Sequence, residues 1–341
     1  MMTPDDYRLQ TLELLRGYRA SQVLIACAEL GVFAALDDEA VAADDLAGRL
    51  DLDTQALSRL LNAAVALGLL ERWDAGYANS AQALACLATD GPFSLGNLAR
   101  REGAFFRRWS RLSEAVRTGR RPEENVRDEG RTNWVRDFEL ALYDIARLNG
   151  TAIAEALGPQ LLQHAGRPIR VLDLGGGHGG YSIALARRYD DLQAVVFDLP
   201  PVAAVAREIV ATTDVADRVA VRAGDFKTDD LGAGFDLALL FGVLVSEPPA
   251  DAVALLRKTA AALVPGGTVV IRGFYLQEDR TGPPEATLFD LQMLLSTGAG
   301  EAHRVADLTG WLTEAGFALP DLVALPAPEE SRLLVARKPG G

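Results

Sequence analysis

The chain has 341 residues, 49% of them apolar and 24% charged, and it carries a formal net charge of −13. These values are typical of a globular protein with two domains. They exclude a large surface for nucleic acid or anionic lipid, because such surfaces need clustered cations. The N-terminus is acidic where a secretory signal is basic, and the early apolar run "VLIACAELGVFAAL" is too short to cross a bilayer. We therefore expect a cytoplasmic protein without a nucleic acid or membrane partner.

Residues 1–100 are predicted to form a mainly helical domain. Apolar residues recur at helical spacing over 7–36, and a helix this apolar needs a partner surface such as a second subunit. The next stretch has the pattern of helix, turn, helix and short hairpin, with Asp53 or Thr54 capping the second helix. This pattern is typical of a winged helix, so a DNA-binding regulator is a rival interpretation. Because Arg59 is the single basic residue of that second helix, a domain for dimerisation that walls the substrate site is favoured.

Residues 101–168 are predicted to be a helical linker followed by helices of the acceptor pocket. Arginines and acidic residues interleave over 101–132, which is typical of a solvated segment, so no ligand is assigned to it. A long helical pattern then covers 134–157. Its apolar stripe consists of Phe138, Leu142, Ile145 and Leu148.

Residues 169–341 alternate between strand and helix patterns, which predicts an α/β fold with a mostly parallel sheet. The strand candidates are "IRVLDL", "LQAVVFDL", "VAVRAGDF", "FDLALLFGVLV", "TVVIRGFYL", "FALPDLVAL" and "SRLLVARK". Only "PAPEE" joins the last two, and a parallel crossover needs about a dozen residues. The last two strands are therefore expected to pair antiparallel.

The first strand candidate leads into Gly175, Gly177 and Gly180, a formal G-x-G-x-x-G. Such a loop and the helix start behind it suit the pyrophosphate of a dinucleotide or another negative group, and spacing alone does not choose between them. Asp198 ends the second strand, where a carboxylate accepts ribose hydroxyls in NAD enzymes and in S-adenosylmethionine (SAM) enzymes alike. The third strand ends in "AGDF", which places Asp225 toward an exocyclic amine and favours SAM.

With these motifs in order, the chain resembles two-domain, SAM-dependent O-methyltransferases of the plant phenylpropanoid, acetylserotonin and bacterial polyketide-tailoring type. The motifs are "DLGGGHGG", "FDLP", "GDF", "LVPGG", "DLQML" and "LTEAGF". The resemblance implies a homodimer formed through the N-terminal domain and a Rossmann-like SAM-binding domain over 169–341. The cofactor residues that it implies are Gly175 and Gly177 at the methionine end, Asp198 and Leu199 at the ribose, Asp225 and Phe226 at the adenine, with Phe241, Gly242 and Arg147 nearby.

The catalytic residues usual in this family are absent. In these relatives a His commonly follows the fourth strand in an "HDW"-like motif and removes the proton from the attacking hydroxyl. Here Val245 takes that position. The Glu that often braces the base corresponds to Gly273, and a Lys frequently found near the cofactor corresponds to Phe241.

Three explanations for the missing base stay open. The acceptor hydroxyl is acidic enough to react largely as its anion, so that alignment with the methyl group supplies most of the acceleration. Alternatively, the nucleophile is a carbon or nitrogen that needs no base. In the third, the fold has another SAM-assisted reaction or a non-catalytic role. We expect the first: methyl transfer to a hydroxyl of an aromatic or polyketide-like small molecule in antibiotic or secondary metabolite biosynthesis, with S-adenosylhomocysteine (SAH) as the product.

The candidates for a replacement base are His303 and Glu301 in "GAGEAHRVADL". The imidazole of His303 has a suitable pKa near neutrality. Relatives often hold Arg at the His303 position, which favours a structural histidine. His178 lies in the glycine loop, where a helix start disfavours its protonated form, and we expect it to contact cofactor or solvent. The third histidine is His164, and no combination of the three has the spacing of metal ligands, so no metal is expected.

The acceptor pocket is expected to be apolar and roomy. The residues predicted to line it are Trp134, Phe138 and Leu142 on one helix, Phe289, Met293 and Thr297 on another, and Val245 at the missing base. A nicotinamide dehydrogenase is a rival that Asp225 and the antiparallel pair disfavour, and a non-methylating SAM-binding protein fits Val245 and Gly273 equally well.

Overall fold

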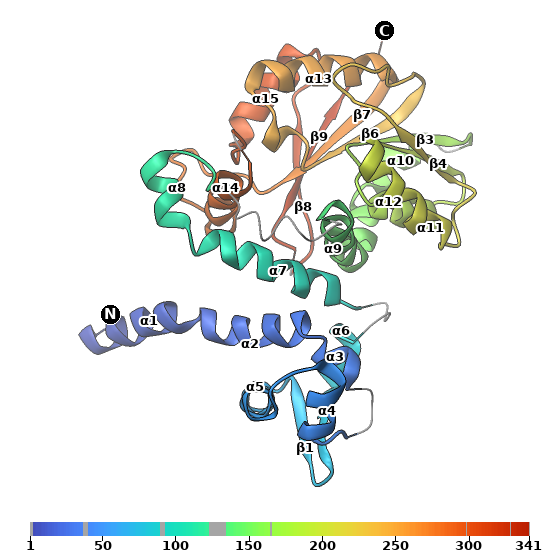
Figure 1. Cartoon of the computed structure of the whole chain (residues 1–341). Helices are drawn as coiled ribbons and strands as arrows, with labels where there is room; N and C mark the ends of the chain where they lie inside the picture. The colour runs from blue at the N-terminus through green and yellow to red at the C-terminus, as the bar shows by residue number, and fades with distance from the viewer. Residues whose placement is uncertain are drawn as a thin grey trace. The chain divides into compact units, whose positions relative to one another are not determined.

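The structure is a computed structural model that describes residues 3–36, 40–88, 93–122, 134–163, 166–297, 299–327 and 329–340. Its internal contacts divide the chain into two compact units, residues 1–107 and 108–341 (Figure 1). Helix α7 (Gly96–Trp109) crosses the point of division. No helix in the described ranges is long and apolar enough to cross a membrane.

The first unit is a small helical domain with one hairpin. Its elements are α1 (Pro4–Arg16), α2 (Tyr18–Glu29), α3 (Val32–Ala35), α4 (Ala43–Leu50), α5 (Thr54–Ala66), β1 (Leu70–Trp73), β2 (Gly76–Asn79) and α6 (Ala81–Cys86). Asp53 caps α5, because its carboxylate accepts the Ala56 N–H at 2.7 Å. Strands β1 and β2 pair antiparallel. The predicted helix, turn, helix and hairpin are therefore confirmed.

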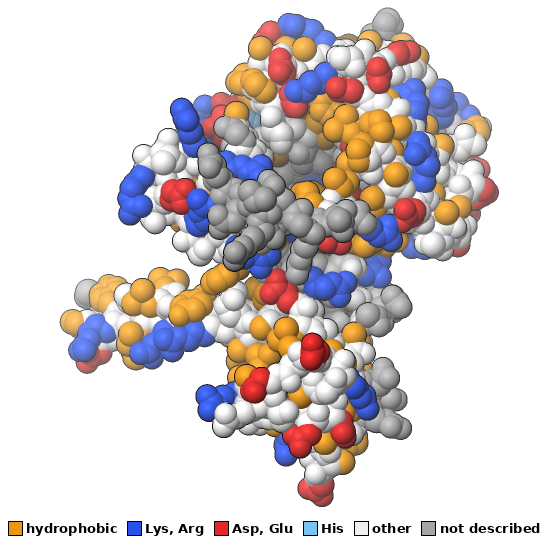
Figure 2. Space-filling view, in the orientation of Figure 1, with side chains coloured by type: hydrophobic (Ala, Val, Ile, Leu, Met, Phe, Trp, Pro, Cys, Tyr) orange, Lys and Arg blue, Asp and Glu red, His pale blue; other side chains and the backbone are white. Residues whose placement is uncertain are grey.

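The N-terminal helix α1 has no buried residue among its thirteen. Tyr7, Leu9, Leu14 and Leu15 all lie on its surface, where Figure 2 shows hydrophobic side chains beside Lys and Arg at the left of the view. The predicted apolar stretch over 7–36 is helical, but it is divided into α1, α2 and α3. An apolar surface of this kind is typical of a helix that packs against another chain.

The second unit is built on a seven-stranded sheet with the order β5-β4-β3-β6-β7-β9-β8. The strands are β3 (Ile169–Leu174), β4 (Leu192–Asp198), β5 (Val219–Ala223), β6 (Phe235–Phe241), β7 (Leu263–Gly273), β8 (Asp321–Ala324) and β9 (Arg332–Arg337). The first five run parallel, whereas β9 pairs antiparallel with both β7 and β8. The expected mostly parallel sheet and the antiparallel pair of last strands are both confirmed.

Helices cover both faces of this sheet, which explains why its strands are apolar on both sides (Figure 1). One face packs against α9 (Trp134–Ala156), α11 (Gly180–Arg188) and α12 (Pro200–Ala211), and the other against α13 (Pro249–Ala262) and α15 (Val305–Glu314). The remaining elements are α8 (Leu112–Thr118), α10 (Gly158–Leu162), the short 3₁₀ helix η1 (Leu244–Ser246) and α14 (Pro284–Ser296). Strand order reverses between β3 and β6, and in such sheets ligands bind at the carboxyl ends beside that point.

Several local predictions need correction. The motif "LVPGG" forms the first part of β7, with a register irregularity between Phe235 and Leu237 of the neighbouring β6. The interleaved charges over 101–132 lie on α7 and α8 as far as the described residues reach, and 123–133 lie outside them. Leu148 is 64% exposed, so the apolar stripe does not define the buried face of α9. That face carries polar residues at three points: Glu139, Asp144 and Asn149.

Candidate active site

The glycine loop follows β3 and has a backbone that only glycine adopts easily. Gly175 and Gly177 have positive φ values of 64° and 51°. A Cβ on Gly177 would lie 2.5 Å from Glu139 Oε2, so a side chain there would collide with α9. The sequence therefore keeps glycine at this loop for two reasons, conformation and the close approach of a buried carboxyl group.

Backbone hydrogen bonds bring the three expected cofactor segments together. The Gly175 N–H donates to Phe197 O at 2.8 Å, and the Gly224 N–H donates to Asp198 O at 2.9 Å. The glycine loop, the end of β4 and the loop after β5 are therefore neighbours at one edge of the sheet. This is the edge where an adenosine that spans strands β3 to β5 would lie.

Asp198 is held in place by two backbone donors. Its Oδ2 accepts the Gly177 N–H at 2.8 Å, and its Oδ1 accepts the Leu199 N–H at 2.7 Å. Burial raises the pKa of this carboxyl group, and the two N–H donors act in the opposite direction. Leu199 is exposed beside it. A fixed carboxylate with this setting suits the recognition of ribose hydroxyls.

The loop after β5 is braced by two of the three lysines of the chain. Lys258 donates from α13 to Phe226 O at 2.7 Å. Lys227 forms an ion pair at 2.8 Å with the largely buried Glu247, which follows η1. Asp225 Oδ1 accepts the Lys227 backbone N–H at 2.8 Å, which fixes the orientation of the carboxylate.

Three carboxyl groups surround the glycine loop, and the sequence had pointed only to Asp198. Asp173 is buried at the end of β3, where its Oδ2 accepts the Ser182 hydroxyl at 2.7 Å. Burial raises the pKa of Asp173 to about 7. Burial, and then the charge of Asp198, raises the pKa of Glu139 to about 7 as well. Nothing in the sequence set Glu139 apart from the other charged residues of α9, such as Asp137 and Asp144.

This concentration of acid decides between the ligands that the glycine loop left open. Carboxylates beside the loop repel a pyrophosphate and attract a cation. The sulfonium and ammonium groups of SAM supply positive charge, whereas a dinucleotide brings negative charge to the same place. The residues present fit SAM, because the glycine cradle, the ribose carboxylate and a buried carboxyl oxygen without a partner all converge there.

His178 is buried rather than open to solvent, which corrects one of the two expectations for it. Its Nδ1 accepts the Gly180 N–H at 2.9 Å, and the rings of Tyr143 and Tyr181 lie against it. Burial, and then the charge of Arg272, lowers the pKa of His178 to about 3. The ring is therefore neutral, as expected, although burial is the main cause.

Phe241, at the position of the usual lysine, packs edge-on against Tyr181 with 4.9 Å between ring centroids. Arg272 donates to the Tyr181 hydroxyl at 2.9 Å and pairs with Glu329 at 3.1 Å. Glu329 also accepts from Asn149 of α9. No sequence pattern indicated this polar network, which joins β7, α9 and α11.

Arg147 pairs with the buried Asp144, one helical turn away, at 2.7 Å. The structure thus places it on α9 with a carboxylate partner of its own. Its role toward the cofactor stays a prediction.

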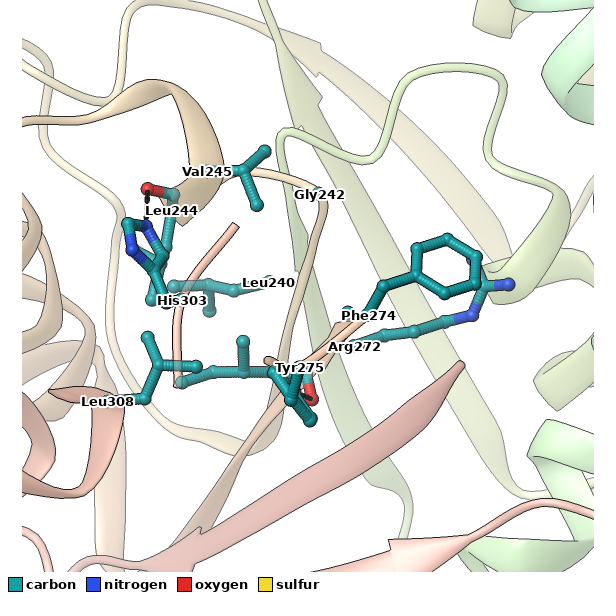
Figure 3. Close-up of a pocket in the computed structure, with 11 residues that line it drawn as sticks. Leu240, Gly242, Leu244, Val245, Arg272, Phe274, Tyr275, His303 and Leu308 are labelled. Atoms are coloured by element: carbon teal, nitrogen blue, oxygen red, sulfur yellow. Dashed lines mark hydrogen bonds between the residues drawn. The ribbon is translucent and has the colours of Figure 1, made fainter. Parts of the chain in front are cut away.

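The residues at the positions of the missing base and of its brace line a small cavity between the ends of β6 and β7 (Figure 3). Val245, Gly273 and His303 all line it. The cavity measures about 10 Å³, which is roughly the space of one water molecule. Its other lining residues are Leu240, Gly242, Leu244, Ile271, Arg272, Phe274, Tyr275 and Leu308.

His303 is buried and points at the turn after β6. Its Nε2 lies 3.2 Å from Leu244 O, as the dashed line in Figure 3 shows. A carbonyl only accepts, so Nε2 carries the hydrogen and donates it. The ring packs edge-on against Trp311, and Nδ1 lies 4.0 Å from the half-exposed Glu301 carboxylate. These contacts attach the 299–304 loop to η1.

The residues predicted to line the acceptor pocket lie on two helices. On α9, the rings of Trp134 and Phe138 are 5.7 Å apart, and Leu142 follows one turn later. On α14, Phe289 packs against Phe274 at 5.2 Å. Met293 follows Phe289 one helical turn later, and its carbonyl accepts the Thr297 hydroxyl at 2.9 Å. That these two helices form one pocket stays a prediction.

In the part of the chain that the structure describes, no cluster of three or more His, Cys, Asp or Glu is arranged to hold a metal ion. His164 lies outside the described residues.

Comparison with known proteins agrees with this site. Residues 109–318 match the O-methyltransferase domain family, and residues 12–89 match the O-methyltransferase dimerisation domain. The chain is 32% identical to the 3-hydroxy-5-methyl-1-naphthoate 3-O-methyltransferase of Streptomyces sahachiroi, covering 92% of this chain and 91% of that protein. It is 30% identical to the tetracenomycin polyketide synthesis 8-O-methyl transferase of Streptomyces glaucescens, covering 96% of each.

The crystal structure of human N-acetylserotonin methyltransferase in complex with SAM superposes with a TM-score of 0.84, at 27% identity over 99% of this chain and all of that one. The fold and site thus define a SAM-dependent methyltransferase. More particularly, the chain belongs to the O-methyltransferase family and carries both its catalytic and its dimerisation domain.

Proposed function

We propose that the enzyme methylates a hydroxyl group of an aromatic or polyketide-like small molecule, and that it does so mainly by alignment rather than by base catalysis. The observation that carries this proposal is the lining of the cavity between β6 and β7. Val245 and Gly273 stand where the family commonly has its base and the brace of that base, and the nearby His303 is engaged with a backbone carbonyl. Support for the acceptor class comes from the relatives named above, which act on aromatic and polyketide hydroxyls by name.

When bound, SAM supplies an electrophilic methyl group whose transfer leaves neutral SAH. The acceptor loses its hydroxyl proton before or during attack, and a phenol beside a conjugated carbonyl loses it near neutral pH without help. The chain's own part is to hold the adenosine with Asp198 and Asp225, and to exclude water with the apolar walls around Val245. Orientation of this kind supplies up to about 7–11 kcal/mol of a bimolecular barrier.

The pH dependence of turnover tests this mechanism. Phenolic acceptors of graded acidity are incubated with the enzyme and SAM, and products are detected by their gain of one methyl group in mass spectrometry. With no base of its own, the enzyme should give a kcat/KM profile whose inflection follows the pKa of each acceptor in turn. An inflection at the same pH for every acceptor identifies a titrating enzyme group and contradicts the proposal. Methylation at carbon or nitrogen contradicts the acceptor class.

We also propose that two copies of the chain form a dimer through residues 12–89. The match to the dimerisation domain and the exposed apolar residues of α1 support this assembly. Light scattering coupled to size-exclusion chromatography tests it, since a monomeric mass at micromolar concentration is the contrary result.

A further inference from the structure

Glu139 is a buried acid that nothing in the accepted function of the fold requires. It lies on α9 with its carboxyl group against Gly177 of the glycine loop, and it is 6% exposed. Its Oε2 has no hydrogen-bond partner among the described residues. A buried carboxylate oxygen without a partner costs about 1–3 kcal/mol or more, so its retention calls for a ligand or a proton.

The surroundings of Glu139 are acidic. Asp198, from the end of β4, is the charged side chain that acts on it in the described part of the chain, and a backbone N–H of His178 faces it from the glycine loop. Asp173, from β3, lies within reach of the same Asp198 charge. The His178 ring is neutral and brings no compensating charge. Together these groups form a pocket wall that favours a cation and, without one, a proton.

Gly177 shows where that cation would lie. The carboxyl group stands in the space that any side chain at Gly177 would fill, so it borders the cradle of the loop itself. The family resemblance places the methionine end of SAM at Gly175 and Gly177, and this end carries the ammonium and the sulfonium. The ligand that carries these positive groups would therefore reach a carboxyl group whose Oε2 has no other partner among the described residues.

We propose that Glu139 recognises the positive charge at the methionine end of SAM and releases its proton to solvent when the cofactor binds. The inference rests on SAM as the cofactor and is independent of which acceptor is methylated. It has a consequence for turnover. SAH keeps the ammonium but lacks the sulfonium charge, so Glu139 holds the product less tightly than the substrate and favours exchange of one for the other.

Calorimetric titration of the full-length protein with SAM, without acceptor, tests the proposal. The measurement is made at about pH 7 in two buffers of different ionisation enthalpy, which yields the number of protons released. Because the pKa of Glu139 in the free protein is about 7, roughly half a proton should leave from this group. Since Asp173 has a pKa of about 7 too, the decisive quantity is the difference between wild type and Glu139→Gln.

Glu139→Gln should abolish this share of the proton release and weaken SAM by about tenfold at about pH 8, with a smaller effect on SAH. Glu155→Gln is the matched control, because it removes an exposed carboxylate from the same helix and should change neither quantity. If Glu139→Gln does not fold, Glu139→Asp keeps the carboxyl group and should keep the proton release.

Three results would overturn the proposal. Equal proton release in wild type and Glu139→Gln shows that the proton comes from another group. An equal loss of affinity for SAM and SAH shows that Glu139 does not sense the sulfonium charge, and it contradicts the preference for SAM over SAH. Failure of the wild-type protein to bind SAM at all removes the cofactor on which the inference rests, and is distinguished from the other two by the wild-type titration alone.

Discussion

The two halves of the site, on either side of Phe241, differ in how their chemistry is supplied. The cofactor half, at the ends of β3, β4 and β5, has carboxylates fixed by backbone donors, and its loop after β5 is braced by lysine. The acceptor half, at the ends of β6 and β7, has Val245 and Gly273 beside a histidine that donates to a backbone carbonyl. The contrast supports the proposed mechanism, in which polar groups serve the cofactor and the acceptor is held by shape and alignment.

The largest expected effect comes from closing the glycine cradle. Gly177→Ala places a Cβ against Glu139 Oε2 and imposes a left-handed backbone on a residue that resists it. We expect SAM affinity to fall by at least about 100-fold, which is about 2.7 kcal/mol. Calorimetry measures it.

Gly316→Ala is the control for Gly177→Ala, because Gly316 also has a positive φ but has open space around it. It should carry the backbone cost without the collision and leave SAM affinity unchanged. If Gly177→Ala and Gly316→Ala bound SAM with similar affinity, the glycine loop would not hold the cofactor. The contrast between the cofactor half and the acceptor half of the site would then lose its basis.

The next effect concerns the polar network that joins β7, α9 and α11. Arg272→Met removes the partner of Glu329 and the donor to Tyr181, and both members of the ion pair are largely shielded from solvent. Loss of one partner of such a pair should lower the free energy of unfolding by about 2–3 kcal/mol. At roughly 2–4 °C per kcal/mol for a unit of this size, the melting temperature falls by several degrees in a calorimetric scan.

Arg257→Met is matched to Arg272→Met, since the Arg257 pair with Glu314 is exposed on both sides. Exposed pairs contribute about 0–1 kcal/mol, so this variant should melt close to wild type. A melting temperature of Arg272→Met equal to that of Arg257→Met would show that the network does not stabilise the sheet.

Sequence alone specified the sheet well because its signals are local. Apolar strands, the glycine loop and the five residues between the last two strands each constrain the chain over short distances. It placed Asp198 and Asp225 at the same edge of the sheet as the glycine loop because they stand at strand ends, where position in the motif determines position in space. The family resemblance extended the prediction to the N-terminal domain, to which it assigned dimerisation.

Glu139, Asp173 and Arg272 escaped that reading for a physical reason. The role of each depends on contact with a segment far away in the sequence, such as Glu139 with the glycine loop or Arg272 with Glu329. The apolar stripe predicted for α9 did not identify its buried face for a similar reason. The helix buries polar residues and leaves Leu148 exposed to solvent. Periodicity shows which residues share a face of a helix. It does not show which face packs against the acidic side chains beside the glycine loop.

A smaller effect follows from the pKa of Glu139 in the cofactor-free protein. Because burial raises that pKa above its unfolded value, the folded state holds an extra proton, and stability falls as pH rises through about 4.5 to 7. Glu139→Gln has no proton to lose there. It should melt a few degrees above wild type at about pH 8 and show a smaller difference at about pH 5. A gain that is equal at both pH values would reflect packing rather than titration.

The smallest expected effect is on the acceptor half, at His303. Gln can donate to Leu244 O as the imidazole does, so His303→Gln should keep the 299–304 loop attached to η1. If alignment carries the reaction, kcat stays within about threefold of wild type and its pH profile is unchanged, whereas loss of a general base costs about 100-fold or more. A 100-fold loss, together with disappearance of a pH inflection in steady-state assays, would make His303 the base. The acceptor half would then contain a group that removes the hydroxyl proton, and the contrast between the two halves would disappear.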